Sequence, residues 1–404
     1  MKILIVNYFY PPIGRAHSFR WCKIANIWAE QGHEITFLTA RAESRRNNNI
    51  ILSEVGARVS ADRFDNKQKN SSPNGKGISF KIISKNIYRK FFWPDGLWYW
   101  LLPLFFRLFS LRSEKYDYVI TYSPTFVSHL GGLFYKIITK EPFDWIAEYG
   151  DPFSISDSMP PNNFNLYRRL NYYFEKKVVF GANKVVFTNK ETKQAYFKAF
   201  GTFNAVVIPH AVDIESFYSN DKKLSSGNIV SLVYVGSFHK QIREPYNAIK
   251  YINDLIGLGK KKGVTINFDI YGPSNGIDVH SLCSDNIKYH GPIPRDEAIQ
   301  KMKNADILVN IENENCVMSP SKEVEYLATG LPILNYYEGE PSGIFQDLQM
   351  KYPDHIYNHE YKSSKVKDAF IFINRCGEAR WSFDTCILTL KKYDFHEISN
   401  KYFI

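Results

Sequence analysis

The chain has 404 residues, more than one hydrophobic core usually organises, so we expect two domains of similar size. Its 44% hydrophobic and 23% charged residues exclude a chain that is disordered throughout. The net charge of +10 comes from the first half: residues 1–200 hold 29 Lys and Arg against 16 Asp and Glu, whereas the remaining residues hold 22 against 25. Nucleic acid, an anionic membrane face or an acidic substrate could each be the partner of such a basic half.

The N-terminal residues and the cysteines indicate the compartment. Met1 and Lys2 lead directly into "ILIVNYFY", which has the pattern of a buried strand and lacks the small-residue cleavage site of a signal peptide. The five cysteines are scattered without CxxC spacing, which argues for a reducing compartment and against disulfides or zinc. We therefore expect a cytoplasmic protein.

The first half predicts a domain with a parallel sheet. An apolar run at Ile3–Val6 is followed by a Pro-Pro-x-Gly loop, a helical pattern that ends at Gly32, and a strand in "EITFLTA". This βαβ unit implies parallel strands. The polar segment Asn66–Gly77 is predicted to be a surface loop. Further strand patterns begin at residues 116, 143, 184 and 205, with helix patterns at 126–139, 165–182 and 190–201.

The segment Phe91–Leu111 is the most aromatic part of the chain. Pro94, Asp95, Pro103 and Arg107 interrupt its apolar run, which excludes a transmembrane helix. It is either a core helix beside an acceptor groove or an interfacial segment, with Trp and Phe at the lipid boundary and flanking Lys and Arg on headgroups. The periodicity does not decide between the two.

The alternation of strands and helices restarts after a predicted linker at Glu215–Asn228. The pattern over residues 229–337 predicts a second α/β unit of Rossmann type. Two such domains in series place the natural ligand site in the cleft between them, at the carboxyl ends of the strands.

The stretch "SPSKEVEYLATGLPIL" predicts a short helix over residues 320–329. Ser319 suits the N-cap, Pro320 the first helical position, and Gly330 the position just after the helix. One helical face is expected to be buried, through Val324, Leu327 and Ala328.

The order of charges in this helix indicates a nucleotide-diphosphate site. Free N–H groups at Ser321 and Lys322 would face an anion, and Lys322 adds a full positive charge. Glu325 lies one turn deeper on the same face, where its carboxylate can accept two hydrogen bonds from the vicinal hydroxyls of a ribose. Glu323 points off that face and is expected to be solvated. The alternative is an ordinary capped helix with a surface i,i+3 ion pair, and the stretch alone does not decide.

Glycine-containing loops could complete such a site. Gly236 would let the backbone approach a ligand, and Lys240 and Arg243 in the same loop supply charge for phosphate; the alternative is a solvated basic loop. Gly272 would also allow close approach near a base or phosphate, although a plain β-turn is favoured there.

The first half has a comparable loop in "PPIGRAHSFR". Gly14 could face a phosphate or sugar, and Arg15 or Arg20 could help to bind it.

Six motifs in order resemble the family-four retaining glycosyltransferases of the GT-B fold, which include bacterial enzymes of surface-polysaccharide assembly. The ending "YDFHEISNKYF" also resembles the last helix of that family, which crosses back to the first domain. The motifs are "MKILIVNYFYPPIGRAHSFR", "AEYGDPFS", "TNKETKQAYF" with "VIPHAVD", "VYVGSF", "IKYHGPIPRDEAIQKMKNADILV" and "SPSKEVEYLATGLPIL".

The resemblance implies an α/β protein of two Rossmann-like domains whose parallel sheets face a central cleft. Residues 1–215 would be the acceptor-binding domain, 216–385 the nucleotide-sugar-binding domain, and 386–404 the helix that crosses back. The donor would be a nucleotide-diphosphate sugar, transfer would retain the anomeric configuration, and no metal or other cofactor would be needed.

The resemblance also implies roles for single residues. Glu325 matches the ribose ligand, and Arg243 falls where a basic residue neutralises the diphosphate and helps the leaving group depart. Gly14 matches the glycine loop, and Asp151 matches an aspartate near the sugar or acceptor. Catalytic roles are thus expected for Asp151, Arg243 and Lys322. Donor binding is expected from Gly14, Gly236, Ser237, Lys240, Gly272, Ser321 and Glu325, and acceptor binding from Arg15 and Arg20.

Two positions depart from the family pattern. Val317 stands where the first glutamate of a pair is expected, eight residues before Glu325, and Ser237 stands where an arginine often follows the glycine. Either Glu312, Glu314 or Asn315 reaches the sugar in place of that first glutamate, or the sugar hydroxyls are bound elsewhere.

We therefore expect a hexosyltransferase or related enzyme that moves a sugar to a lipid-linked saccharide in capsule, O-antigen or exopolysaccharide assembly, on the inner face of the cell membrane. The alternative is a catalytically silent GT-B-like partner in a polysaccharide-assembly complex. An oxidoreductase is disfavoured because no GxGxxG follows a strand, and nucleic-acid binding because no such motif appears. His129 and His210 are expected to be structural.

Overall fold

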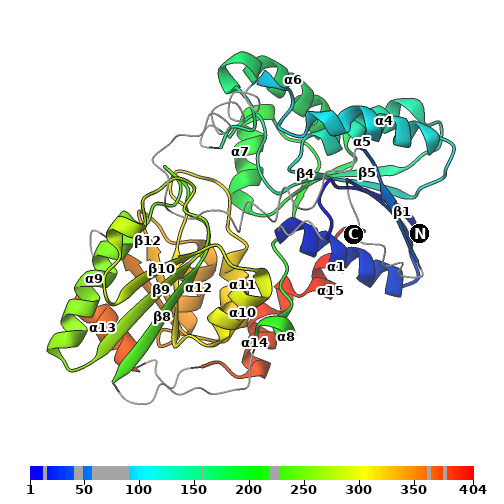
Figure 1. Cartoon of the computed structure of the whole chain (residues 1–404). Helices are drawn as coiled ribbons and strands as arrows, with labels where there is room; N and C mark the ends of the chain where they lie inside the picture. Colours follow the sequence, from blue (N-terminus) through cyan, green and yellow to red (C-terminus); the bar gives the residue numbers. More distant parts are fainter. Residues whose placement is uncertain are drawn as a thin grey trace. The chain divides into compact units, whose positions relative to one another are not determined.

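The computed structural model of the chain describes residues 1–11, 16–40, 49–56, 91–156, 159–218, 228–361, 365–375 and 380–404. They form two compact units (Figure 1). Unit 1 comprises Met1–Pro209 together with Ile398–Ile404, and unit 2 comprises His210–Glu397. The sequence places these boundaries after residues 215 and 385.

Unit 1 is built on a seven-stranded parallel sheet in the order β3-β2-β1-β4-β5-β6-β7. The order reverses between β1 and β4, as in doubly wound α/β folds. The strands are β1 (Lys2–Val6), β2 (Glu34–Thr39), β3 (Ile50–Glu54), β4 (Tyr118–Ser123), β5 (Asp144–Tyr149), β6 (Lys184–Phe187) and β7 (Ala205–Val207).

Helices cover both faces of this sheet (Figure 1). One face carries four helices that share a single core with the sheet. On the other face α1 (Ala16–Glu30) packs with the end of the chain: Trp28 Nε1 donates to the Ser399 carbonyl at 3.3 Å, and the rings of Trp21 and Tyr402 lie 5.5 Å apart. The four helices are α4 (Leu101–Ser110), α5 (Val127–Ile138), α6 (Phe164–Gly181) and α7 (Lys190–Phe200).

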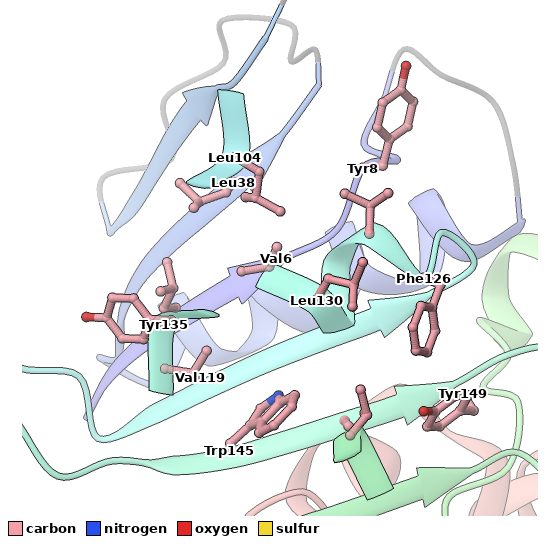
Figure 2. Close-up of a cluster of buried hydrophobic side chains, with 14 of the residues drawn as sticks. Val6, Tyr8, Leu38, Leu104, Val119, Phe126, Leu130, Tyr135, Trp145 and Tyr149 are labelled. Carbon is pink, nitrogen blue, oxygen red and sulfur yellow. The ribbon is translucent and has the colours of Figure 1, made fainter. Parts of the chain in front are cut away.

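Figure 2 shows the core on the α4–α7 side of unit 1. Val6 points into it because alternate side chains of a strand face opposite sides of the sheet. Leu104 and Leu130 enter it from α4 and α5. Trp145 is fully buried there, and its indole N–H donates to Thr121 Oγ1 at 2.9 Å, so its one polar atom is paired.

Unit 2 is built on a six-stranded parallel sheet in the order β10-β9-β8-β11-β12-β13. The order reverses here between β8 and β11. The predicted α/β class with two Rossmann-like parallel sheets is confirmed. The strands are β8 (Ile229–Val235), β9 (Thr265–Tyr271), β10 (Ile287–Gly291), β11 (Ile307–Ile311), β12 (Ile333–Tyr337) and β13 (Ile356–Glu360).

Two hydrophobic cores flank the sheet of unit 2. Leu232 and Tyr234 of β8 pack in one core with α9 (Tyr246–Lys261) and α13 (Val366–Arg375). Val233 and Val235 point the other way, into a core with α10 (Arg295–Lys303), α11 (Lys322–Ala328), α12 (Gly343–Lys351) and α14 (Phe383–Leu390).

The aromatic segment Phe91–Leu111 is partly buried and partly exposed, and its two possible roles stay open. It forms a 3₁₀ turn, η1 (Trp98–Trp100), followed by α4. Trp100, Leu104 and Leu108 are buried in the core of unit 1, whereas other large apolar side chains of the segment are exposed. Among the described residues no helix is long and apolar enough to cross a membrane. The predicted loop Asn66–Gly77 lies outside the described residues.

The elements near two of the expected boundaries differ from the expectation. The predicted linker Glu215–Asn228 starts inside a short helix, α8 (Ile214–Phe217), whose Phe217 is buried in unit 2. In place of one helix over 386–404 there are α14, a 3₁₀ turn η4 (Lys391–Tyr393) and α15 (Phe395–Asn400). The Asp394 side chain accepts from the His396 N–H at 2.8 Å, which begins the new helix.

Gly132 of α5 tests how tightly unit 1 is packed. A Cβ there would lie 2.6 Å from the buried Trp145 ring, so Gly132→Ala should lower the free energy of unfolding by about 1–3 kcal/mol, measured by urea or thermal denaturation. Gly257→Ala in α9 is the matched control, because no atom lies within 4 Å of its Cβ position and alanine favours a helix. Equal denaturation midpoints for Gly132→Ala and the unchanged protein would contradict this packing.

Candidate functional site

The candidate site lies at the point in unit 2 where the strand order reverses. β8 ends at Val235 and β11 ends at Ile311, and the loops that follow these neighbouring strands start at the same edge of the sheet. Ligands of doubly wound sheets bind at such an edge, beyond the carboxyl ends of the strands.

Arg243 joins these two loops. Its guanidinium Nη2 donates to Asn313 Oδ1 at 2.7 Å, and Nη1 donates to the Ser237 carbonyl at 3.4 Å. Arg243 is buried, and its Nε has no hydrogen-bond partner among the described residues. A buried cation that retains an unused donor is suited to an anionic group.

The loop that carries Arg243 is held by backbone contacts. His239 and Arg243 exchange two backbone hydrogen bonds, of 3.0 and 2.8 Å, around Gln241, whose φ is 65°. The Glu314 N–H donates to the Ile242 carbonyl at 2.6 Å and ties this loop to the one after β11. Lys240 lies at the tip of the turn and is exposed.

Glu325 is buried, and a cation reaches each of its carboxylate oxygens. Lys322 Nζ lies 2.6 Å from Oε2, and Arg295 Nη2 lies 3.0 Å from Oε1. Burial alone would raise the pKa of Glu325, but the charges and hydrogen bonds of the two cations outweigh it and hold that pKa below its usual value. The carboxylate is therefore ionised at neutral pH and can accept further hydrogen bonds.

The helix α11 that carries Glu325 is shorter and more buried than predicted. It spans Lys322–Ala328, with Ser321 rather than Ser319 at the N-cap, and Gly330 follows it at φ 70° as expected for the residue after a helix. The prediction that Glu323 is solvated is wrong, because every residue from Glu323 to Ala328 is buried. The i,i+3 ion pair is present, but it is not on the surface.

Tyr326 fixes α11 to the end of β8. Its hydroxyl accepts from the Val235 N–H at 2.7 Å and donates to the Val235 carbonyl at 3.0 Å. Because Gly236 follows Val235 directly, one side chain sets the distance between α11 and the loop that carries Arg243.

The two glycines of the site have close neighbours within the protein itself. A Cβ at Gly272 would lie 2.0 Å from the Gly236 carbonyl oxygen, and φ at Gly272 is 129°, so only glycine fits there. A Cβ at Gly236 would meet the Tyr234 hydroxyl at 2.6 Å. These contacts explain both residues without a ligand, and their donor-binding roles stay predictions.

Of the possible substitutes for the missing glutamate, Glu312 has a structural partner. Its carboxylate accepts from the Ser342 N–H, at 2.8 Å from Oε2, and from Asn335 Nδ2 at 2.6 Å. These bonds connect the end of β11 to the start of α12. Val317 is 38% exposed, so a glutamate in its place would reach solvent rather than a packed interior.

Of the four predicted site residues in unit 1, one follows a strand, two lie outside the described residues and one is buried. Asp151 follows β5, where the Gly150 N–H donates to the Ser123 carbonyl at 2.7 Å. Gly14 and Arg15 lie outside the described residues. Arg20 is not placed to bind an acceptor from solution, because it is buried.

The contacts of Arg20 favour a structural role. Its Nε lies 3.3 Å from Glu148 Oε1, Nη2 donates to the Tyr402 hydroxyl at 3.0 Å, and Nη1 donates to the Pro209 carbonyl at 3.0 Å. The Tyr402 hydroxyl also donates to Glu148. Arg20 thus connects α1, β5 and the end of the chain inside unit 1.

The two histidines make structural contacts. His129 is fully buried with Nδ1 2.7 Å from Thr121 Oγ1, and burial lowers its pKa to about 3, so it is neutral. His210 Nε2 lies 3.1 Å from the Ser319 carbonyl, just before α11.

Two residues of the site were missed by the sequence analysis. Asn313, 70 residues from Arg243, and Arg295, 30 residues from Glu325, have no local spacing rule that connects them to their partners. The only signal was their position: Asn313 follows a predicted strand, and Arg295 begins a predicted helix.

No protein-family model matches the chain, and no curated protein matches it by sequence. Solved structures do match over the full length. WaaG, a glycosyltransferase involved in lipopolysaccharide biosynthesis, is similar with a TM-score of 0.60 and 12% identity over 99% of this chain and 98% of its own. The chain has the GT-B fold.

Two further structures agree with this fold. A glycosyltransferase from Rickettsia africae ESF-5 has a TM-score of 0.61 and 12% identity, covering 100% of this chain and 96% of its own. "Trehalose-6-phosphate from E. coli bound with UDP-2-fluoro glucose" has a TM-score of 0.60 and 10% identity, covering 100% and 98%. The predicted GT-B resemblance is therefore confirmed at the level of the fold.

Arg295→Gln tests the electrostatics of Glu325. Removing one of the two cations should lower the free energy of unfolding at neutral pH by about 1–3 kcal/mol, because a buried carboxylate loses a charged hydrogen bond. Since the pKa of Glu325 is lowered in the folded state, its contribution is present at neutral pH and is lost as the pH falls through that pKa. The difference between Arg295→Gln and the unchanged protein should therefore shrink in acid.

The measurement is thermal unfolding as a function of pH. Arg375→Gln is the control, since it removes the same charge from an exposed position at the end of α13. An offset for Arg295→Gln that stays constant from neutral to acid pH would show that Glu325 is not the partner that matters.

Proposed function

We propose that the protein is a retaining glycosyltransferase that takes a sugar from a nucleotide-diphosphate sugar and transfers it to a lipid-linked saccharide. The observation that carries this proposal is Arg243 at the strand-order reversal of unit 2, a buried cation whose Nε finds no hydrogen-bond partner in the part of the chain that the structure describes. The GT-B fold supports it, because the E. coli structure with that fold is bound with UDP-2-fluoro glucose.

In this proposal the diphosphate of the donor lies against Arg243. Lys240 and Lys322 add positive charge, and the backbone at Gly236, Ser237 and Ser321 borders the donor. A fixed cation stabilises the negative charge that develops on the diphosphate as its bond to the sugar breaks.

Glu325 would hold the ribose of the donor. Each carboxylate oxygen has two lone pairs, so the contacts to Lys322 and Arg295 leave capacity for the two ribose hydroxyls. The same cations keep the carboxylate charged, which strengthens those hydrogen bonds.

Unit 1 would bind the acceptor, with Asp151 acting on the sugar or acceptor beyond the end of β5. The pathway, whether capsule, O-antigen or exopolysaccharide, belongs to this proposal, and so does the inner-membrane surface as the place of reaction. The second candidate is a catalytically silent partner protein, which Val317 and Ser237 favour because they replace two expected charged groups, a glutamate and an arginine.

Nucleotide binding tests the donor site. A screen of nucleotides and nucleotide sugars by thermal shift should identify a ligand, which at 100 times its Kd adds about 2.7 kcal/mol to stability. Calorimetry with that ligand should show roughly tenfold weaker binding, or worse, for Arg243→Gln and Glu325→Gln, since each loses charged hydrogen bonds. Lys260→Gln, an exposed change at the end of α9, should bind as the unchanged protein does.

Two outcomes would count against the donor site. One is that no nucleotide or nucleotide sugar shifts the unfolding temperature. The other is that Arg243→Gln, shown to be folded, binds the ligand with undiminished affinity.

Product stereochemistry separates the enzyme from the silent partner. With the ligand from the screen and a lipid-linked acceptor, the transferred sugar should keep the anomeric configuration of the donor, as read from the anomeric proton couplings by NMR. Donor binding without transfer or hydrolysis under any acceptor condition would favour the silent partner.

A further inference from the structure

An exposed apolar stripe runs along α4. Leu102, Phe106 and Phe109 recur at i, i+4 and i+7 and so lie on one side of the helix. Leu102 is 64% and Phe106 75% exposed, whereas Leu104 and Leu108 on the opposite side are fully buried. The helix is therefore apolar on both sides, and only one side is used by the core.

A second stripe runs along α6. Leu166, Leu170, Tyr173 and Phe180 are exposed at i, i+4, i+7 and i+14, opposite the buried Glu175. α5 contacts both helices and contributes Ile137, which is 80% exposed.

The exposed charges on these three helices are all positive. Their basic residues are Arg107, Lys136, Arg168, Arg169, Lys176 and Lys177, and their single acidic residue, Glu175, is fully buried. Glu114 and Glu141, which follow α4 and α5, are each paired with a lysine, at 2.6 and 3.6 Å.

Cations also lie directly beside the exposed rings. The Arg112 guanidinium is 4.0 Å from the centre of the Phe109 ring, and Lys177 Nζ is 5.0 Å from that of Tyr173. Rings that enter the acyl boundary next to cations that reach headgroups are the arrangement of an interfacial surface.

We propose that the outer face of α4, α5 and α6, hereafter the α4–α6 face, docks on an anionic lipid surface. Charge complementarity selects this occupant: a second copy of the chain would bring the same cations against each other, whereas anionic headgroups neutralise them. The face lies entirely within unit 1. The proposal rests on the inner-membrane part of the proposed function and names the surface that would carry it, whereas the donor site is tested by a different measurement.

Trp100 is not part of the α4–α6 face. Trp100 is buried and donates its N–H to the Val55 carbonyl at 2.8 Å, so a Trp100 variant would report on folding rather than on lipid. Leu102 and Phe106 are the informative positions.

The experiment is co-sedimentation of the full chain with phosphatidylcholine vesicles, with and without phosphatidylglycerol. The protein should bind only the anionic vesicles, and binding should fall with salt. Leu102→Ser/Phe106→Ser should weaken it roughly tenfold or more, because two apolar side chains no longer enter the boundary. Replacing Arg168, Arg169, Lys176 and Lys177 by Gln should weaken it roughly tenfold or more through lost headgroup attraction.

Matched controls lie on unit 2. Met350→Ser/Leu388→Ser removes equally exposed apolar side chains, and replacing Lys260, Lys261, Lys262 and Lys288 by Gln removes the same charge. Both should bind vesicles as the unchanged protein does, and all variants should keep its unfolding temperature.

Three results would overturn the proposal. They are absence of binding to anionic vesicles, equal losses in the unit 2 controls, and a dimer in sedimentation velocity that Leu102→Ser/Phe106→Ser dissociates. The last result would assign the face to a second copy of the chain. The same variants should bind nucleotide without lipid as the unchanged protein does, because the face lies outside the donor site. A loss of vesicle binding is then distinguishable from a failure of the donor site.

Discussion

The carboxylate of Glu325 is buried, and a buried charge must be compensated where it lies. Lys322 and Arg295 supply that compensation from α11 and α10. The ion pairs therefore fix two helices relative to each other at the edge of the unit 2 sheet. Tyr326 then fixes α11 to the end of β8 through both backbone groups of Val235. The position of Arg243 follows, because its loop begins one residue later.

The strand order reverses at the corresponding point in both units, but the units differ in what they expose. In unit 2 the polar groups gather where the strand order reverses, which suits a charged small ligand. In unit 1 the unusual feature is the α4–α6 face, where apolar and basic side chains share an outer surface that folding does not use. A donor site on one unit and a lipid-docking face on the other would together suit an enzyme that brings a water-soluble donor to a membrane-bound acceptor.

The fold was largely predictable, because local hydrophobic periodicity indicates where most strands and helices lie. The site was predictable only in its local parts: Lys322 and Glu325 are three residues apart, so their ion pair follows from helical geometry. Arg295 and Asn313 were missed, because their partners are brought to them by the sheet. Glu323 was misjudged because a helical wheel shows the faces of a helix but does not show how many of them are covered.

The sequence by itself determined the two parallel α/β units and the resemblance to GT-B glycosyltransferases, since both depend on short-range patterns and motif order. Only the tertiary structure decided which charges are buried and which apolar side chains are left outside. It buries Arg20 and Glu325 in ion pairs, and it divides the Phe91–Leu111 segment between a core and a surface. The physical reason is that burial is a property of neighbours, and most of those neighbours are distant in the chain.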